Sequence, residues 1–210
     1  MKEQEIQDEL ASIRNLMERS SKFISLSGLS GILAGIYALI GAGLAYNMMY
    51  TGLSRTYVMS NHLNGIHVPD ERVILLLLIA VLVLVASLIT GLVLTTRKAK
   101  AKGQPVWSKT SKVLLFNMAV PLVSGGLLIL ILLSRAYYGI VGPASLIFYG
   151  LALISASNFT FNDVKYLGIC EILLGLIAAC LPGYGLLFWA IGFGVLHIVY
   201  GSVMYFKYDR

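Results

Sequence analysis

Charged residues are scarce in this 210-residue chain: Asp, Glu, Lys and Arg together make up only 12%, whereas apolar residues make up 58%. A soluble domain has about twice that share of charged residues, on the order of 25%. The mean hydropathy is +0.81, and a soluble protein of this length could not bury so much apolar surface. The composition therefore excludes an ordinary soluble domain, and the length predicts one domain without a second, soluble one.

Cysteine is rare as well, with only Cys170 and Cys180 in the chain. Both fall inside one predicted helix, where ten residues at about 1.5 Å per residue place them roughly 15 Å apart, too far for a disulfide. The sequence also lacks an acidic pair, a mid-membrane lysine or any other catalytic constellation. We therefore do not expect an enzyme, and the sequence indicates no metal site and no cofactor.

Long apolar runs are what the sequence has in abundance. Six of them are long enough, or nearly so, to cross a hydrocarbon core of about 30 Å as helices of roughly 20 residues. The fifth is the shortest and holds a carboxylate, and it ends at a Pro-Gly-Tyr-Gly sequence that favours a tight reversal. The sequence predicts an all-α polytopic membrane bundle of six transmembrane helices in three hairpins. The predicted spans are 24–49, 73–96, 113–133, 139–157, 164–181 and 186–206.

The distribution of Lys and Arg predicts the orientation, because basic residues stay on the cytoplasmic side. With the amino terminus inside, only Arg55, Arg72 and Arg135 of the 16 basic residues lie outside. The 97–112 loop alone carries six bases and no acid. We expect a multi-pass protein of the bacterial inner (plasma) membrane with both termini in the cytoplasm. The 13 inside residues are Lys2, Arg14, Arg19, Lys22, Arg97, Lys98, Lys100, Lys102, Lys109, Lys112, Lys165, Lys207 and Arg210.

The first 22 residues are hydrophilic and carry more acid than base, which indicates that the first span is a signal anchor and not a cleavable signal peptide. We expect a cytoplasmic amphipathic helix over 1–22, followed by a six-helix transmembrane domain over 23–210. This helix either leads along the surface into the first span or pairs two protomers as a short coil. Two heptads are too few for such a coil without help from the membrane part. Its apolar residues at helical spacing are Ile6, Leu10, Ile13 and Met17.

Small residues form stripes on three of the predicted spans. In the first span, Gly31 and Gly35 make a GxxxG unit, which lets another helix approach closely. Packing within one chain is the expected role of these stripes, with a homodimer as the alternative. The stripes contain Gly28, Gly31, Gly35, Ala38 and Ala42 in the first span, Gly168, Gly175 and Ala178 in the fifth, and Ala190, Gly194 and Gly201 in the sixth.

Two ionisable residues, Glu171 and His197, lie inside the fifth and sixth spans on these small-residue faces. At 1.5 Å per residue, their depths from the inner boundary are about 8–10 Å and about 14 Å, and Asn117 enters the third span at a similar level. An ionisable residue within a membrane is costly and marks a functional site by default. Either these three residues form a buried polar functional site, or a Glu–His or Glu–Asn hydrogen bond merely locks the bundle.

Two further patterns carry less weight. His62 and His67, followed by Asp70 and Glu71 in the outer loop, are residue types that bind zinc, but the His-x4-His spacing without a scaffold is typical of a solvated loop. The Gly-Leu-Ser-Gly sequence around Ser30 matches the GxSG around the nucleophile of rhomboid-type intramembrane proteases. Here the serine lies near the cytoplasmic side of a helix rich in small residues, which favours a packing role.

The stretch LGICEILLGLIAACLPGYGLLFWAIGFGVLHIVYG, residues 167–201, resembles a group of uncharacterised bacterial six-helix membrane proteins. Its order of a Gly-containing helix, a Pro turn and a second Gly-rich helix is similar to the hairpin unit of the acid-resistance (HdeD-like) membrane protein family. The resemblance covers the last third of the chain. The first hairpin departs from it by its 22-residue outer loop, and the second by Pro143 inside its helix. The resemblance implies an association with membrane stress and supplies no catalytic residue.

Three classes of function are compatible with these patterns. The first is a small transporter, channel or proton-responsive sensor centred on Glu171 and His197. The second is a structural or regulatory membrane protein acting through its amino-terminal helix and the basic 97–112 loop, and an intramembrane enzyme is the least supported. The lipid bilayer is the expected partner, and nucleic acid is not, because the basic residues cluster beside apolar runs. The sequence does not identify a small-molecule or ion ligand.

Overall fold

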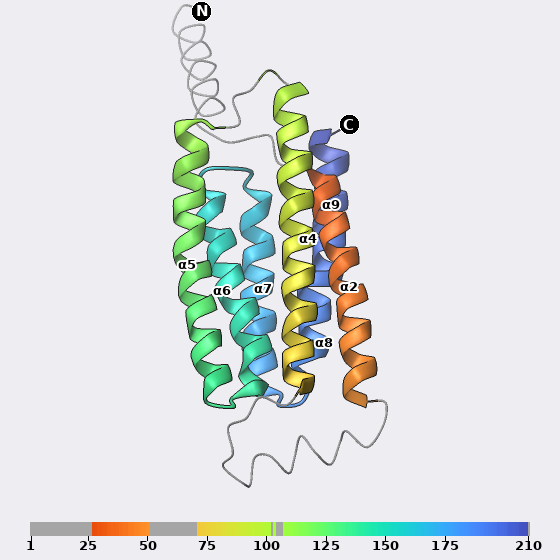
Figure 1. The fold of residues 1–210 in the computed structure, drawn as a ribbon. Coiled ribbons are helices and arrows are strands. Elements are labelled where there is room, and N and C mark those ends of the chain that lie inside the picture. Colours follow the sequence, from red (N-terminus) through yellow and green to blue (C-terminus); the bar gives the residue numbers. More distant parts are fainter. Residues whose placement is uncertain (1–26, 51–70, 102, 104–106, 210) are drawn as a thin grey trace, which may run out of the picture.

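The computed structural model describes residues 27–50, 71–101, 103 and 107–209, and all regular secondary structure in these ranges is helical (Figure 1). The all-α architecture expected from the apolar runs is confirmed for this part of the chain. The predicted amphipathic helix at 1–22 and the loop histidines His62 and His67 lie outside the described residues.

The helices follow the predicted spans closely. Five of them are long and apolar enough to cross a membrane, a property compatible with an integral membrane protein. The remaining one, α7, is only 18 residues long and contains Asp163, Lys165 and Glu171. The first helices are α2 (Gly28–Tyr50), α4 (Glu71–Ala101), α5 (Lys109–Ser134), the 3-10 turn η1 (Tyr138–Ile140), α6 (Val141–Ser157) and α7 (Asp163–Cys180).

The last helix changes its winding along its length. It begins as α8 (Gly185–Trp189), widens into the π-helix η2 (Ala190–Leu196), returns to α9 (His197–Met204) and ends as a second π-helix, η3 (Tyr205–Asp209). π-Helical turns are rare and frequently occur at functional sites. A turn over residues 181–184, in which Gly183 has a φ of 95°, reverses the chain between α7 and this helix.

The contacts link the helices in the order α5, α6, α7, the last helix, α2 and α4. In Figure 1, α5, α6 and α7 lie on one side of the bundle, and α4, α2 and α9 lie on the other. α6 packs along α7, and α5 covers the other side of α6. α2 lies between α4 and the last helix. Two groups of three helices therefore meet where α6 and α7 contact the last helix, and the candidate site lies at this junction.

Glycines allow α2 and the last helix to touch through their backbones. A Cβ added at Gly201 would lie 2.5 Å from the backbone nitrogen of Ile32, and one added at Gly35 would lie 2.6 Å from the carbonyl oxygen of Gly194. Both distances are well inside the ordinary contact range of 3.4–4 Å. The face with the GxxxG unit is therefore covered by a helix of the same chain. Gly28 and Gly31 also lie in this contact.

The α6–α7 pair uses the same device. A Cβ added at Gly150 on α6 would lie 2.5 Å from the carbonyl oxygen of Gly168 on α7. At Gly175 it would lie 2.9 Å from the carbonyl oxygen of Pro143. Because the backbones approach so closely, the side chains between these glycines are held in a narrow space. Glu171 lies one turn from each of the two α7 glycines, so this packing places it in the interior.

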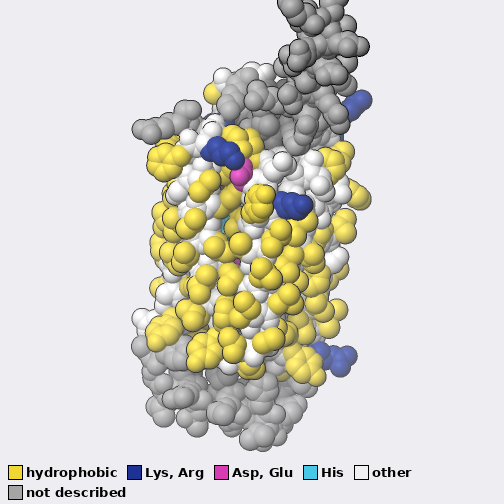
Figure 2. Space-filling view, turned by 180° about the vertical axis from the view of Figure 1, so that it is seen from behind, with side chains coloured by type: hydrophobic (Ala, Val, Ile, Leu, Met, Phe, Trp, Pro, Cys, Tyr) yellow, Lys and Arg dark blue, Asp and Glu magenta, His cyan; other side chains and the backbone are white. Residues whose placement is uncertain are grey.

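Apolar side chains cover the outside of the bundle. Figure 2 shows one face, on which hydrophobic side chains extend over most of the height and Lys and Arg lie toward the two ends. Between residues 74 and 93 of α4 the exposed side chains are almost all large and apolar, for example Leu82, Leu88 and Leu92. An apolar exterior with a charged rim at each end is the surface expected of a helical bundle surrounded by lipid.

Candidate functional site

Glu171 is fully buried, with 0% of its surface exposed. It lies in the middle of α7, on the face that packs against α6 and the last helix. Among the described residues, neither of its carboxyl oxygens has a hydrogen-bond partner. Burying a charged carboxylate without partners costs several kcal/mol or more. Whether this carboxyl group is protonated therefore depends on the neighbouring side chains that can stabilise its charge.

The imidazole of His197 lies beside it, because α9 begins at His197 directly opposite this face of α7. Its Nδ1 is 3.5 Å from Oε1 of Glu171 and 3.0 Å from the carbonyl oxygen of Gly192. A carbonyl oxygen can only accept, so Nδ1 carries a hydrogen and donates it to Gly192. Gly192 belongs to the π-helix η2, five residues before His197, so the wide turn delivers the carbonyl that fixes the tautomer.

Tyr149 of α6 completes the site. Its hydroxyl is 2.7 Å from Nε2 of His197. Because Nδ1 carries the hydrogen of a neutral imidazole, Nε2 accepts and the Tyr149 hydroxyl donates. Glu171, His197 and Tyr149 thus form a polar chain across three helices, and we call these three residues the Glu171 site.

The surroundings of the site leave little room. A Cβ added at Gly192 would collide with the carboxyl oxygen Oε2 of Glu171 and would lie 2.5 Å from Cδ2 of Leu146, a fully buried side chain. Phe193 lies against the site with its ring centroid 5.0 Å from that of Tyr149 and 5.9 Å from that of His197. The Glu171 carboxyl group therefore occupies the space that a side chain at position 192 would need.

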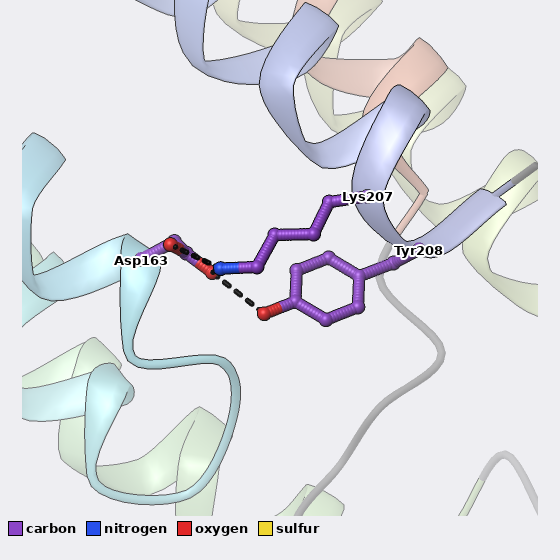
Figure 3. A network of polar contacts seen from close by, with 3 residues as sticks. All are labelled: Asp163, Lys207 and Tyr208. Carbon is purple, nitrogen blue, oxygen red and sulfur yellow. Dashed lines mark hydrogen bonds and ion pairs between the residues drawn. The ribbon is translucent and has the colours of Figure 1, made fainter.

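A second polar cluster ties α7 to the end of the last helix (Figure 3). The amine Nζ of Lys207 is 3.0 Å from both carboxylate oxygens of Asp163, and the hydroxyl of Tyr208 donates to Oδ2 at 2.8 Å. The ring of Phe161 stacks on Tyr208 with centroids 4.1 Å apart. We call Asp163, Lys207 and Tyr208 the Asp163 clasp, and the end of the bundle that holds it the clasp end.

The clasp changes the acidity of Asp163, which lies at the first residue of α7, before the predicted span. Partial burial on its own would raise the pKa of this carboxyl, but hydrogen bonds from Tyr208 and Lys207, with the nearby Lys207 charge, outweigh it and lower the pKa below 3.8. Asp163 is therefore ionised at neutral pH. The position also suits a negative charge, because the amino-terminal end of a helix is electropositive.

Asn117 does not join the Glu171 site, which corrects the expectation from its depth. Its side-chain amide donates to the carbonyl oxygen of Val113 in its own helix at 2.8 Å. α5 packs on α6 at the far end of the helix row from α9. Equal depth in the membrane does not make two residues neighbours when their helices lie apart.

Ser30, the serine of the GxSG pattern, makes a hydrogen bond to the backbone just before its own helix. The hydroxyl of Ser30 donates to the carbonyl oxygen of Ser27 at 2.6 Å, one turn earlier in the chain. The neighbouring Gly31 packs against the backbone of α9 at His197 and Gly201. Within the described part of the chain, no group of three or more His, Cys, Asp or Glu side chains is placed to hold a metal ion.

Several residues of these clusters were missed at the sequence level. Tyr149 lies in the interior of a predicted span, whereas tyrosines of membrane proteins favour the interface. That position was the available indication of a buried partner. The Asp163 clasp joins residues 44 and 45 positions apart, and no periodic pattern predicts such a pair.

Comparisons of this chain with models of protein families, with curated proteins and with solved structures gave no match.

Proposed function

We propose that this chain is an integral membrane protein that responds to protons through the Glu171 site. One observation carries the proposal: a fully buried carboxyl group without hydrogen-bond partners faces an imidazole whose two nitrogens are both engaged. A carboxyl group that served only to lock the bundle would be expected to have its oxygens satisfied. This one is left free to take up or release a proton.

The contacts support a particular proton arrangement. The distance of 3.5 Å between Nδ1 and Oε1 is long for a charged ion pair, and Nδ1 is turned toward the Gly192 carbonyl. A neutral imidazole beside a protonated carboxyl fits these distances. Transfer of that proton from Glu171 to His197 would keep the site neutral overall, but loss of it to solvent would leave a buried charge without compensation.

A net charge in the site would act on the helices around it. The close glycine contacts between α6 and α7 and between α2 and the last helix leave little space for side chains to move. Water can therefore reach the charge only if the junction between α6, α7 and the last helix opens. The π-helix η2 is placed to absorb this movement, because a wide turn can pass to α-helix by shifting one residue. A sealed carboxyl favours a sensor over an open channel.

The second candidate function is a structural membrane protein. The observation in its favour is the tight glycine packing that joins α2 to the last helix and α6 to α7. In that case the Glu171 site would only set the order of the helices. The base count supports an orientation with the clasp end, where α2 begins and η3 ends, in the cytoplasm, and we place the protein in the bacterial inner membrane.

Trp189 provides a native reporter that separates the two candidates. Its ring centroid is 5.1 Å from that of Phe193, which in turn contacts His197. In a Trp107→Phe background, its fluorescence should be recorded in nanodiscs from about pH 4 to about pH 9, the range in which carboxyl and imidazole groups titrate. We expect a sigmoidal transition that Glu171→Gln abolishes. Asp163→Asn, a neutral substitution outside the site, should retain it.

A flat profile in the unsubstituted background would reject the sensor and favour the structural candidate. A transition that persists in Glu171→Gln would assign the titration to another group. Folding of each variant should be checked by its helical circular dichroism, so that a missing transition is not mistaken for an unfolded protein.

A further inference from the structure

The polar residues around the Glu171 site are distributed unevenly along the bundle axis. Toward the clasp end, the last helix carries Tyr200, three residues after His197, and then Lys207 and Tyr208. Toward the other end it carries Phe193 and Trp189, and between residues 181 and 196 it has no charged residue. The site therefore has hydroxyl groups on the side of the clasp end and two aromatic rings, those of Phe193 and Trp189, on the other side. We call these two rings the aromatic plug.

Tyr200 bridges the distance between the site and the clasp. Its side chain packs against the same buried cluster of Leu153, Val164 and Leu167 as Tyr149 does. Val164 of this cluster directly follows Asp163 in α7, so the cluster against which Tyr200 and Tyr149 pack extends from the site toward the clasp. At 1.5 Å per residue, Tyr200 is about 4.5 Å further along the axis than His197, and Tyr208 is about 12 Å beyond Tyr200.

The aromatic plug is continuous in the opposite direction. The rings of Trp189 and Phe193 have centroids 5.1 Å apart, and Phe193 in turn contacts both Tyr149 and His197. These side chains have no group that accepts and releases a proton along the axis. From the remaining side, α2 contributes no Asp, Glu, Lys, Arg or His between Gly28 and Tyr50.

We propose that the Glu171 site exchanges protons with one side of the membrane only, the side of the Asp163 clasp, by way of Tyr200 and Tyr149. This inference rests on the proposed function and adds the direction and the route. In the orientation favoured by the base count, that side is the cytoplasm. The protein then reports the pH of the compartment that faces Asp163.

The proton count along the route is balanced. A proton arriving from solvent at the clasp binds a lone pair of the Tyr200 hydroxyl, which releases its own proton toward Tyr149. Tyr149 passes one proton to Nε2 of His197 and receives one in return. His197 releases the proton on Nδ1 to Oε1 of Glu171, so each intermediate group ends with as many protons as it began with, and Glu171 gains one. The imidazole is left with its hydrogen on Nε2, and this hydrogen must return to Nδ1 before the bond to the Gly192 carbonyl is restored.

The experiment measures the rate of the Trp189 response after a pH jump in the Trp107→Phe background. In nanodiscs we expect Tyr200→Phe to keep the equilibrium amplitude and to slow the response about tenfold or more, because a phenyl ring cannot relay a proton. Tyr166→Phe is the matched control, since Tyr166 is an exposed tyrosine at the start of α7, and its rate should be unchanged. Tyr208→Phe provides a second variant, expected to slow the response to a smaller degree.

Sidedness is measured in proteoliposomes by a pH jump applied to the outside only. The fraction of molecules with the clasp end outside is determined from protease cleavage of a carboxy-terminal tag. We expect the fast phase to have an amplitude that equals this fraction. An amplitude that follows the opposite fraction, or a Tyr200→Phe rate equal to that of the control, would overturn the route while leaving the sensor intact. Absence of any equilibrium transition would instead reject the proposed function and the route together.

Discussion

Substitution of Gly201 by alanine tests whether the backbone contact between α2 and α9 holds the bundle together. The added Cβ would lie 2.5 Å from the backbone nitrogen of Ile32 and 2.8 Å from the carbonyl oxygen of Gly28. Backbone atoms cannot rotate away, and ordinary contact begins at 3.4 Å, so the two helices must separate by about 1 Å. A gap of that size removes about a quarter to a half of the dispersion energy along the contact.

The expected magnitude is the difference between two opposing effects. Overpacking costs about 1–3 kcal/mol, whereas replacing glycine by alanine inside a helix gains about 1 kcal/mol. We therefore expect Gly201→Ala to lower the free energy of unfolding by up to about 2 kcal/mol. The control is Gly43→Ala on α2, where nothing lies within 4 Å of the added Cβ, and it should be neutral or stabilising by up to about 1 kcal/mol.

The assay is reversible unfolding by SDS in mixed micelles, followed by circular dichroism, with a linear extrapolation to zero denaturant. Equal stabilities of Gly201→Ala and Gly43→Ala would refute the close-contact account of the α2–α9 pair. A shift to a dimer in Gly201→Ala alone would show that the glycine face, once displaced from α9, is available to a second copy of the chain.

Three further predictions concern the polar residues and the topology. If the Glu171 site only sets the order of the helices, Glu171→Gln and His197→Ala should each lower the melting temperature in detergent, and the double variant should lose less than the sum, with a coupling of about 0.5–3 kcal/mol. In the sensor, Gln has the charge and nearly the shape of a protonated Glu171, so Glu171→Gln should keep a melting temperature close to that of wild type. The folded-state pKa of Asp163 lies below its ordinary value of 3.8, so the clasp stabilises the folded protein above that pH and loses its effect as the pH falls through the folded-state pKa. The melting temperatures of wild type and Asp163→Asn should accordingly differ at neutral pH and converge on acidification, and a pH-independent difference would argue against the clasp. In a background without Cys170 and Cys180, an impermeant thiol reagent on intact cells should label a cysteine at position 60 and not one at position 103; equal labelling would contradict the orientation.

The helices were predictable because their apolar runs are long and uninterrupted. The neighbourhood of Glu171 and His197 was also within reach of the sequence, since a Pro-Gly turn makes their helices antiparallel and both residues lie on small-residue faces. Hydropathy and periodicity describe one helix at a time, and the short reversal adds only the next helix along the chain.

The rest of the site depends on contacts between helices that are distant in sequence. Tyr149 reaches His197 from another hairpin, 48 residues away, and no spacing rule predicts that pairing. The π-helical turn that brings the Gly192 carbonyl to the imidazole differs from an α-helix by one residue of winding, which leaves no trace in the apolar pattern. The misplacement of Asn117 has a related cause: the sequence gives depth along the membrane normal but not the lateral order of helices.

Infrared difference spectroscopy can show whether the buried Glu171 carboxyl group is protonated in lipid. At neutral pH we expect a carbonyl stretch of a protonated carboxylic acid that is absent in Glu171→Gln, shifted in Tyr149→Phe and unchanged in Asp163→Asn. Exposed carboxyl groups are ionised at that pH and do not contribute to this band. Only carboxylate bands from the protein in lipid at neutral pH, or a protonated band that remains in full after Glu171→Gln, would show that Glu171 is not the protonated group.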